Sequence, residues 1–162
     1  MKKVCHKEAM KIISELNDKK TRLINTELRE KTVRYRDGES RPTGGYSYQK
    51  TRDEIKKLDA EIRRIKHVLA KANCAVMLDG FDMTLGEGLV YLAQLTQEHE
   101  RIDALANEMQ TFVSITANGV TIHNDCMYDV KKAEADAAAL NSEIGRLQVA
   151  IDRANLVNYI EL

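Results

Sequence analysis

The sequence contains no tryptophan, one proline and two phenylalanines among its 162 residues. A core with so few aromatic rings must be filled by Leu, Ile, Val, Ala and Met, which suit the packing of helix against helix. Hydrophobic residues make up 43% of the chain and charged residues 31%, a balance typical of long helices with solvated outer faces. The composition therefore predicts an all-α fold, and the length fits a single helical domain over residues 1–162.

The chain also lacks an uninterrupted apolar run of about 18 residues, so we expect no membrane-spanning helix and no membrane partner. The charged N-terminus is followed by no apolar segment of the signal-peptide type. Cys5, Cys74 and Cys126 are odd in number and form no CxxC pair. Small secreted domains carry an even set of cysteines that pair as disulfides. Together these absences predict a cytoplasmic protein.

Sequence motifs for catalysis and cofactor binding are missing as well. The sequence has no glycine-rich phosphate loop, no GxSxG and no HExxH. The nearest approach to a metal site is His123-x-x-Cys126, which offers two ligands where zinc requires four. A polar hairpin residue and a buried thiol explain that pair more simply, and we expect His99 to be a hydrogen-bonded core histidine. The sequence predicts a protein that is not an enzyme and has no catalytic residue, cofactor or metal.

The formal net charge is zero, but the charge is unevenly distributed along the chain. Residues 1–73 carry 20 Lys/Arg against 11 Asp/Glu, a net charge of +9, and residues 74–162 carry 5 against 14, a net charge of −9. In one interpretation the two halves lie against each other or against a neighbouring subunit, so that their fields cancel. In the other, the basic half meets a polyanion.

Two predicted helices carry the strongest pattern in the sequence. Their apolar residues recur at alternating steps of three and four, as in the a/d seam of a coiled coil. In the predicted helix over residues 126–156 the seam is Val130, Ala133, Ala137, Leu140, Ile144, Leu147, Ile151 and Ala154. In the predicted helix over residues 51–73 it is Ile55, Leu58, Ile62, Ile65, Leu69 and Ala72. Each seam indicates a helix that pairs with another helix along a narrow stripe.

Two further helices are predicted over residues 4–31 and 84–111. The first has an apolar stripe on one face, and the second begins with Thr84 followed by Glu87, which is the pattern of a capping box. We therefore expect four long helices, arranged as two antiparallel coiled-coil-like hairpins in a helical bundle.

Between residues 113 and 123 the apolar pattern changes to a period of two around Asn118-Gly119. An Asn-Gly pair in such a setting is a strong signal for a β-hairpin with a two-residue turn, in which both turn residues have positive φ. Pairing around that turn places Ile115 opposite Ile122 on one apolar face. Since an isolated hairpin is marginal in water, we expect this face to dock on the helices or on another subunit.

A long loop over residues 32–49 contains the only proline and three of the eight glycines. The wider segment 29–52 holds seven Lys/Arg, three acidic residues and three tyrosines. The candidate interaction residues are Arg34, Tyr35, Arg36, Arg41, Tyr46 and Tyr48. Such a loop can bind nucleic acid through phosphate neutralisation and base stacking, can anchor another protein, or can be a plain mobile loop.

Two stretches of the sequence carry a resemblance to known proteins. Residues 79–89, DGFDMTLGEGL, form a turn followed by a helix start, and residues 154–162, ANLVNYIEL, close the chain. Both are similar to segments of a small all-helical bacterial family of unknown function, some of whose members are named septicolysin. The resemblance implies a bacterial protein of about this length and carries over no catalytic residue. The septicolysin name implies a cytolysin.

The sequence leaves three functional hypotheses. The first is a non-enzymatic homo-oligomer with a scaffolding or interaction role, whose partner is itself, with another protein as an alternative. The second is nucleic-acid binding through the basic loop within residues 29–52. The third is the membrane-active cytolysin that the resemblance implies.

Overall fold

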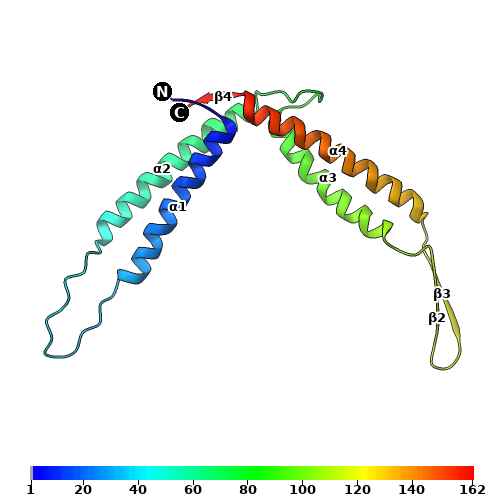
Figure 1. The fold of residues 1–162 in the computed structure, drawn as a ribbon, viewed down its shortest axis with the longest axis horizontal. Helices are drawn as coiled ribbons and strands as arrows, with labels where there is room; N and C mark the ends of the chain where they lie inside the picture. Colours follow the sequence, from blue (N-terminus) through cyan, green and yellow to red (C-terminus); the bar gives the residue numbers. More distant parts are fainter. Residues whose placement is uncertain (1) are drawn as a thin grey trace. The chain divides into compact units, whose positions relative to one another are not determined.

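The computed structural model describes residues 2–162 and is mostly helical (Figure 1). The helices are α1 (His6–Glu30), α2 (Tyr48–Asn73), α3 (Leu85–Ala106) and α4 (Val130–Val157). The strands are β1 (Lys3–Cys5), β2 (Thr111–Ile115), β3 (Thr121–Asp125) and β4 (Tyr159–Glu161). The expected all-α class is therefore corrected to a mostly helical fold with two small antiparallel sheets, β1–β4 and β2–β3.

The chain divides into two compact units, where the sequence suggested one domain. Unit 1 comprises Met1–Ala75 and Asn155–Leu162, and unit 2 comprises Val76–Ala154. Unit 1 contains the pair α1 and α2, and unit 2 contains the pair α3 and α4 with the β2–β3 hairpin between them in sequence. Each unit has its own buried apolar cluster, so each is described by itself.

In unit 1, α1 and α2 lie side by side and run in opposite directions (Figure 1). The buried cluster of this unit consists of Val4, Ala9, Ile65 and Ile160. Lys20, which interrupts the apolar stripe of α1, donates from Nζ to Asp59 Oδ1 of α2 at 2.6 Å. Its charge is thus paired across the two helices while its stem lies along the apolar stripe.

The two chain ends pair as strands in unit 1, a feature that the sequence analysis did not predict. Val4 of β1 lies opposite Ile160 of β4, and both side chains are buried. The predicted helix 4–31 therefore begins later, at His6, because the preceding residues are extended. Glu8 caps this start by accepting a hydrogen bond from the Cys5 N–H at 2.8 Å.

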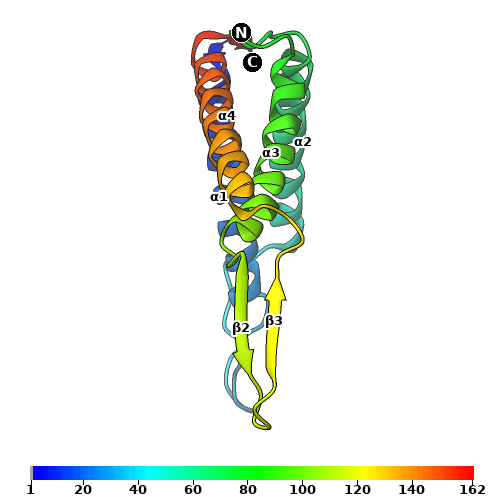
Figure 2. The ribbon, with the colours of Figure 1, turned by 90° about the vertical axis from the view of Figure 1, so that its right-hand side faces the viewer.

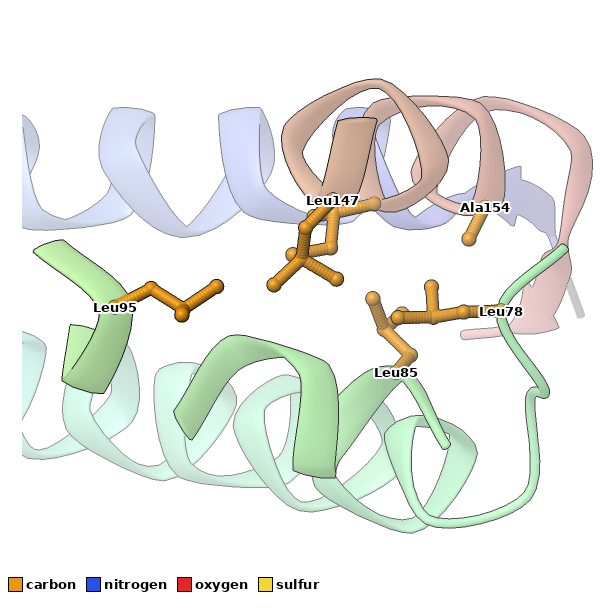
Figure 3. Close-up of a cluster of buried hydrophobic side chains, with 6 residues drawn as sticks. Leu78, Leu85, Leu95, Leu147 and Ala154 are labelled. Atoms are coloured by element: carbon orange, nitrogen blue, oxygen red, sulfur yellow. The ribbon is translucent and has the colours of Figure 1, made fainter. Parts of the chain in front are cut away.

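In unit 2, the core forms where α3 and α4 meet the turn that precedes α3 (Figure 3). The buried cluster consists of Leu78, Leu85, Leu95, Leu147, Ile151 and Ala154. The predicted capping box is confirmed, since Glu87 N–H donates to Thr84 Oγ1 at 3.2 Å and Thr84 N–H donates to Glu87 Oε2 at 2.7 Å. The Thr84 N–H and the Thr84 hydroxyl both donate to the Glu87 carboxylate, and these two bonds lower the pKa of Glu87.

Both predicted seams face inward. Every seam residue of α2 and α4 is buried or half-buried, including Ile65 and Leu147, which are almost completely excluded from solvent. The predicted helix 84–111 is shorter than expected and ends at Ala106, and α4 begins at Val130 rather than at residue 126. The prediction for His99 was wrong, because this side chain is half-buried and forms no hydrogen bond within residues 2–162.

The predicted β-hairpin is present between α3 and α4, but its register differs by one residue from the expectation. Thr121, not Ile122, lies opposite Ile115. The turn has three residues rather than two: Thr116 N–H donates to the Val120 carbonyl at 2.9 Å and Gly119 N–H donates to the Thr116 carbonyl at 2.9 Å. Only Gly119 has positive φ, 76°, which is typical of a three-residue hairpin loop.

This register separates the apolar side chains that were expected on a single face. A shift of one residue in pairing exchanges the faces of a strand, because side chains alternate. Val113 and Ile115 therefore project from one face, and Phe112 and Ile122 from the other. All four are exposed, and β2 and β3 extend beyond the ends of α3 and α4 (Figure 2). Within unit 2 the hairpin does not dock on the helices.

The close approach between α3 and the turn before it generates a first prediction. A Cβ added at Gly88 would overlap Cδ1 of the buried Leu78. We expect Gly88→Ala to lower the free energy of unfolding by about 1–3 kcal/mol, because the core must shift to admit the methyl group. Urea denaturation monitored by circular dichroism measures the change.

Gly145→Ala is the matched control, because it is also a helical glycine but has no heavy atom within 4 Å of the added Cβ. We expect this variant to be up to about 1 kcal/mol more stable than the wild type, since alanine has the higher helix propensity. Equal stabilisation by both substitutions would contradict the packing of Gly88 against Leu78.

Candidate functional site

The candidate interaction loop connects α1 to α2 and forms neither helix nor strand between residues 31 and 47. Arg34, Arg36 and Arg41 are exposed, and none of their guanidinium groups forms an ion pair or a hydrogen bond with residues 2–162. Arg36 N–H donates to Glu39 Oε2 at 3.0 Å, which orders a tight turn at the tip. The three side-chain charges are therefore available to an external partner.

The three tyrosines predicted with these arginines differ in their surroundings. Tyr35 and Tyr48 are 53% and 61% exposed, so their rings are open to a partner. Tyr46 is half-buried, and its hydroxyl donates to the Glu27 carboxylate of α1. The hydrogen bond to Glu27 raises the pKa of Tyr46 to about 12. Tyr46 is thus a tether between the loop and α1 rather than a free contact residue.

An open apolar groove lies on the α1–α2 pair, and the sequence analysis did not single it out. It has a volume of about 630 Å³ and lies among the half-buried side chains of Leu16, Leu23 and Leu58. Lys19 and Lys57 stand at its margin. Leu16 and Leu58 belong to the stripes that the sequence predicted to be covered by the partner helix. The pair of helices leaves part of these stripes uncovered.

The charge division predicted from the sequence coincides with the two units. Unit 1 carries 20 Lys/Arg and 12 Asp/Glu, a net charge of +8, and unit 2 carries 5 and 13, a net charge of −8. The groove of unit 1 lies within the basic unit, but Glu54 and Glu61 also line it. A groove with an apolar floor and margins of both signs suits a protein surface better than a simple anion.

Unit 2 has a smaller groove of about 470 Å³ beside the turn that precedes α3. Arg153 and Arg146 of α4 line it together with Phe81. Arg153 is already engaged, because Nη1 donates to Asp79 Oδ2 at 2.7 Å. Further along the same helix pair, Tyr91 donates to Glu143 Oε1 at 2.6 Å, and this bond raises the pKa of the tyrosine. These contacts join α4 to the elements that it packs against.

The residues considered as metal ligands are not gathered into a site. His123 lies exposed in β3, and Cys126 Sγ donates to the Met109 carbonyl at 3.2 Å. No group of three or more His, Cys, Asp or Glu side chains within residues 2–162 is placed to hold a metal ion. All three cysteines are free thiols. No described helix has the length and apolar character needed to cross a membrane.

His6 is the buried polar residue that the sequence analysis missed. Its side chain is 1% exposed, and Nδ1 lies 3.1 Å from the carbonyl of Asn158, 152 residues away in the sequence. Since a carbonyl only accepts, Nδ1 carries the proton and Nε2 is left as a buried acceptor without a partner. The ring therefore fastens the start of α1 to the residue that precedes β4, within unit 1. No local pattern in the sequence identifies this contact.

The sequence matches no protein-family model and no curated protein. The structure is similar to the crystal structure of a functionally unknown conserved protein from Corynebacterium diphtheriae, with a TM-score of 0.73. That similarity covers 99% of this chain and 100% of the other, at 18% sequence identity. It shows a shared fold with a bacterial protein of unknown function. These comparisons give no support to the septicolysin name.

The tether from the loop to α1 generates a second prediction, on pH dependence. Because the folded pKa of Tyr46 is raised from 10.0 to about 12, the tether is intact below pH 10 and is lost as the pH rises through 12. Glu27→Gln removes the acceptor charge, so we expect Tyr46 to titrate nearer pH 10 in this variant. Ultraviolet absorbance of tyrosinate during an alkaline titration measures the shift.

Tyr46→Phe is the control for this titration, since it removes the one group whose titration is in question. The difference between the wild-type and Tyr46→Phe curves isolates Tyr46 from the other tyrosines. Superimposable titrations of the wild type and Glu27→Gln would show that the hydrogen bond does not hold the loop in solution.

Proposed function

We propose that this protein is a non-enzymatic, homo-oligomeric helical scaffold of the cytoplasm, in which helices of one copy cover apolar surface on another. The observation that carries the proposal is the open groove among Leu16, Leu23 and Leu58. The proposal assigns no cofactor and no metal to the protein, and it places the role of the chain in association rather than in chemistry.

The helices of unit 1 form a single pair, α1 and α2. Stable domains bury an apolar stripe between at least two layers of secondary structure, with both sides of the stripe covered. Ala9 and Ile65 are fully covered where Val4 of β1 and Ile160 of β4 join the helix pair. Leu23 and Leu58, at the groove, are half-buried. A further helix laid against this groove would extend the coiled-coil-like packing of the seams and remove the remaining apolar area from water.

The charges of the two units favour a second copy of the chain as the partner. A protein with one unit of net charge +8 and another of −8 has no net charge, so copies do not repel one another at long range. The basic unit of one copy and the acidic unit of another attract, which accelerates encounter at low salt. The positive and negative side chains at the groove margin then favour contacts with another protein surface over binding of a small anion.

The scaffold proposal generates a third prediction, on solution mass. We expect the wild type to elute as a multiple of 18.4 kDa in size-exclusion chromatography with light scattering. Leu58→Glu places a charge in the groove, so we expect the dissociation constant to rise about tenfold or more. Leu147 and Ile62 are unsuited to this test, because both are buried within their own units and a charge there would unfold the chain.

Leu28→Glu is the matched control, since Leu28 is a 58% exposed leucine on α1 that does not line the groove. We expect it to keep the wild-type mass. Circular dichroism and thermal melting establish that both variants are folded. A monomeric wild type would overturn the scaffold proposal, and a folded Leu58→Glu variant of unchanged mass would exclude the groove as the contact.

Nucleic-acid binding is the second candidate function, favoured by the net charge of +8 on unit 1 and by the three unpaired arginines of the loop. Arg34, Arg36 and Arg41 can each neutralise one phosphate. Tyr35 and Tyr48 expose rings on which unpaired bases can stack. A single-stranded chain is the form that this combination fits.

A fourth prediction tests this candidate by fluorescence anisotropy with a labelled single-stranded oligonucleotide. Three phosphate contacts predict an affinity that falls about 20-fold between about 50 mM and about 200 mM salt. Replacing Arg34, Arg36 and Arg41 together by Glu is expected to abolish the signal. The triple replacement of Lys56, Arg63 and Lys66 by Glu on the exposed face of α2 changes the net charge equally and is expected to retain binding. Equal losses in both triple variants would exclude the loop as a specific site.

A further inference from the structure

The β2–β3 hairpin exposes apolar side chains on both of its faces. Ile115 is 73% exposed, Phe112 is 52% exposed, Val113 is 49% exposed and Ile122 is 42% exposed. A two-stranded hairpin with no third strand and no covering helix is marginally stable in water. The β2–β3 hairpin would therefore gain stability from a third strand or from a segment packed on its face. The hairpin lies wholly within unit 2.

The hydrogen-bond pattern of the hairpin identifies which backbone groups are open. The Thr116 N–H bonds to the Val120 carbonyl at one end of the ladder, and the Cys126 N–H bonds to the Gln110 carbonyl at the other. In an antiparallel pair, hydrogen-bonded and non-hydrogen-bonded pairs alternate. The backbone groups of Thr111, Val113 and Ile115 therefore point outward from β2. Those of Thr121, His123 and Asp125 point outward from β3.

The lack of charge on the hairpin limits the kinds of partner that its strand edges can bind. Residues 109–124 contain no Asp, Glu, Lys or Arg. Natural proteins protect open strand edges with charges or proline, and neither is present on β2. An uncharged edge offers no attraction to a charged ligand, but it meets its own copy without repulsion. This property favours a second copy of the chain over a polyanion or a charged peptide.

The two edges are not equivalent. On β2 the outward residues are Thr111, Val113 and Ile115, all β-branched and all uncharged. On β3 they include His123 and Asp125, and a twofold pairing centred on His123 would place that ring opposite its own copy. Cross-strand pairs of β-branched residues are stabilising, and the β3 edge offers only one β-branched residue, Thr121, beside an imidazole and a carboxylate. The β2 edge is therefore the better self-complementary surface.

We propose that the β2 edge of one copy pairs antiparallel with the β2 edge of a second copy, centred on Val113, to form a four-stranded sheet. This proposal rests on the homo-oligomer proposed above and names one surface through which the copies associate. Val113 faces its own counterpart, and Thr111 faces Ile115 of the second copy. Three outward N–H groups from each copy give six intermolecular hydrogen bonds.

The pairing also covers apolar side chains. The four-stranded sheet places Val113 and Ile115 of both copies next to one another on one face, and brings the two Phe112 rings to the same side on the other. Four strands with shared apolar faces exceed the size at which a sheet becomes independently stable. The open backbone groups of the β2 edge and the apolar side chains on the hairpin faces thus both favour a second copy of the chain as the partner.

Amide hydrogen exchange, measured by NMR on the full-length chain, tests the proposal directly. We expect slow exchange at the outward amides of Thr111, Val113 and Ile115, and fast exchange at the outward amides of Thr121 and His123. A single hairpin in solution would leave both sets fast, because neither set bonds within the hairpin. The exchange rates at the β2 and β3 edges are measured in the same sample, so they can be compared directly.

Two proline variants provide the matched test, because Val113 and His123 are cross-strand partners at the same distance from the turn. Val113→Pro removes an outward N–H of β2 and no hydrogen bond within the hairpin. We expect it to raise the dissociation constant of the dimer at least about tenfold, since both copies lose a bond. His123→Pro makes the same change at the β3 edge and is expected to retain the dimer. Protected inward amides of Phe112 and Ser114 in each variant establish that the hairpin itself is folded.

The outcomes separate this inference from the scaffold proposal. A monomeric wild type overturns both. An oligomeric wild type with fast exchange at Val113 and with no effect of Val113→Pro overturns the β2 pairing and leaves the groove of unit 1 as the interface. Loss of the dimer in His123→Pro but not in Val113→Pro would assign the contact to β3 and would also overturn the proposal. Slow exchange at Val113 only after addition of a different protein would assign the edge to a strand of that protein instead.

Discussion

The structure depends on how much apolar surface two packed helices can cover. Two helices share one line of contact, so an apolar stripe wider than that line stays partly open. In unit 1, Ala9 and Ile65 are buried where β1 and β4 add Val4 and Ile160 to the helix pair, while Leu23 and Leu58 remain at an open groove. In unit 2 the line between α3 and α4 buries Leu95 and Leu147 and is closed at one end by Leu78 from the preceding turn. The surfaces that could carry a function are the surfaces that this limit leaves uncovered.

Specific polar contacts position the segments that the apolar clusters do not hold. Lys20 and Asp59 pair across α1 and α2, and Tyr46 fastens the basic loop to Glu27 of α1. His6 joins the start of α1 to the residue before β4 through the Asn158 carbonyl, within unit 1. Each contact links residues that are distant in sequence. The net charge is also separated by unit, since unit 1 carries +8 and unit 2 carries −8.

The similarity to the C. diphtheriae protein extends over almost the whole of both chains, with little sequence identity. Helix-pair architectures tolerate wide sequence change because they require only an apolar period and suitable caps. The shared fold therefore assigns no activity to either protein, since the same architecture can serve different roles. The surfaces of this chain that bear on its function are the groove and the loop of unit 1 and the hairpin edge of unit 2.

The sequence by itself determined the local structure and which side chains face inward. Helical periodicity identified all four helices and both seams, and the Thr84–Glu87 pattern identified the start of α3, because these signals depend on residues three or four positions apart. The six residues of the candidate loop were predicted from the sequence, and the structure places Tyr48 at the start of α2 and ties Tyr46 to Glu27 by a hydrogen bond. The tertiary structure alone decided the pairing of β1 with β4 and the burial of His6, since their partners lie about as far away as the chain allows. It also decided the hairpin register: within the turn only Gly119 has positive φ, and the turn is one residue longer than expected.

Local sequence patterns indicate which conformation a residue prefers. Whether its side chain is covered depends on which distant segments of the chain pack against it. The open groove and the open strand edge are therefore visible only in the folded chain.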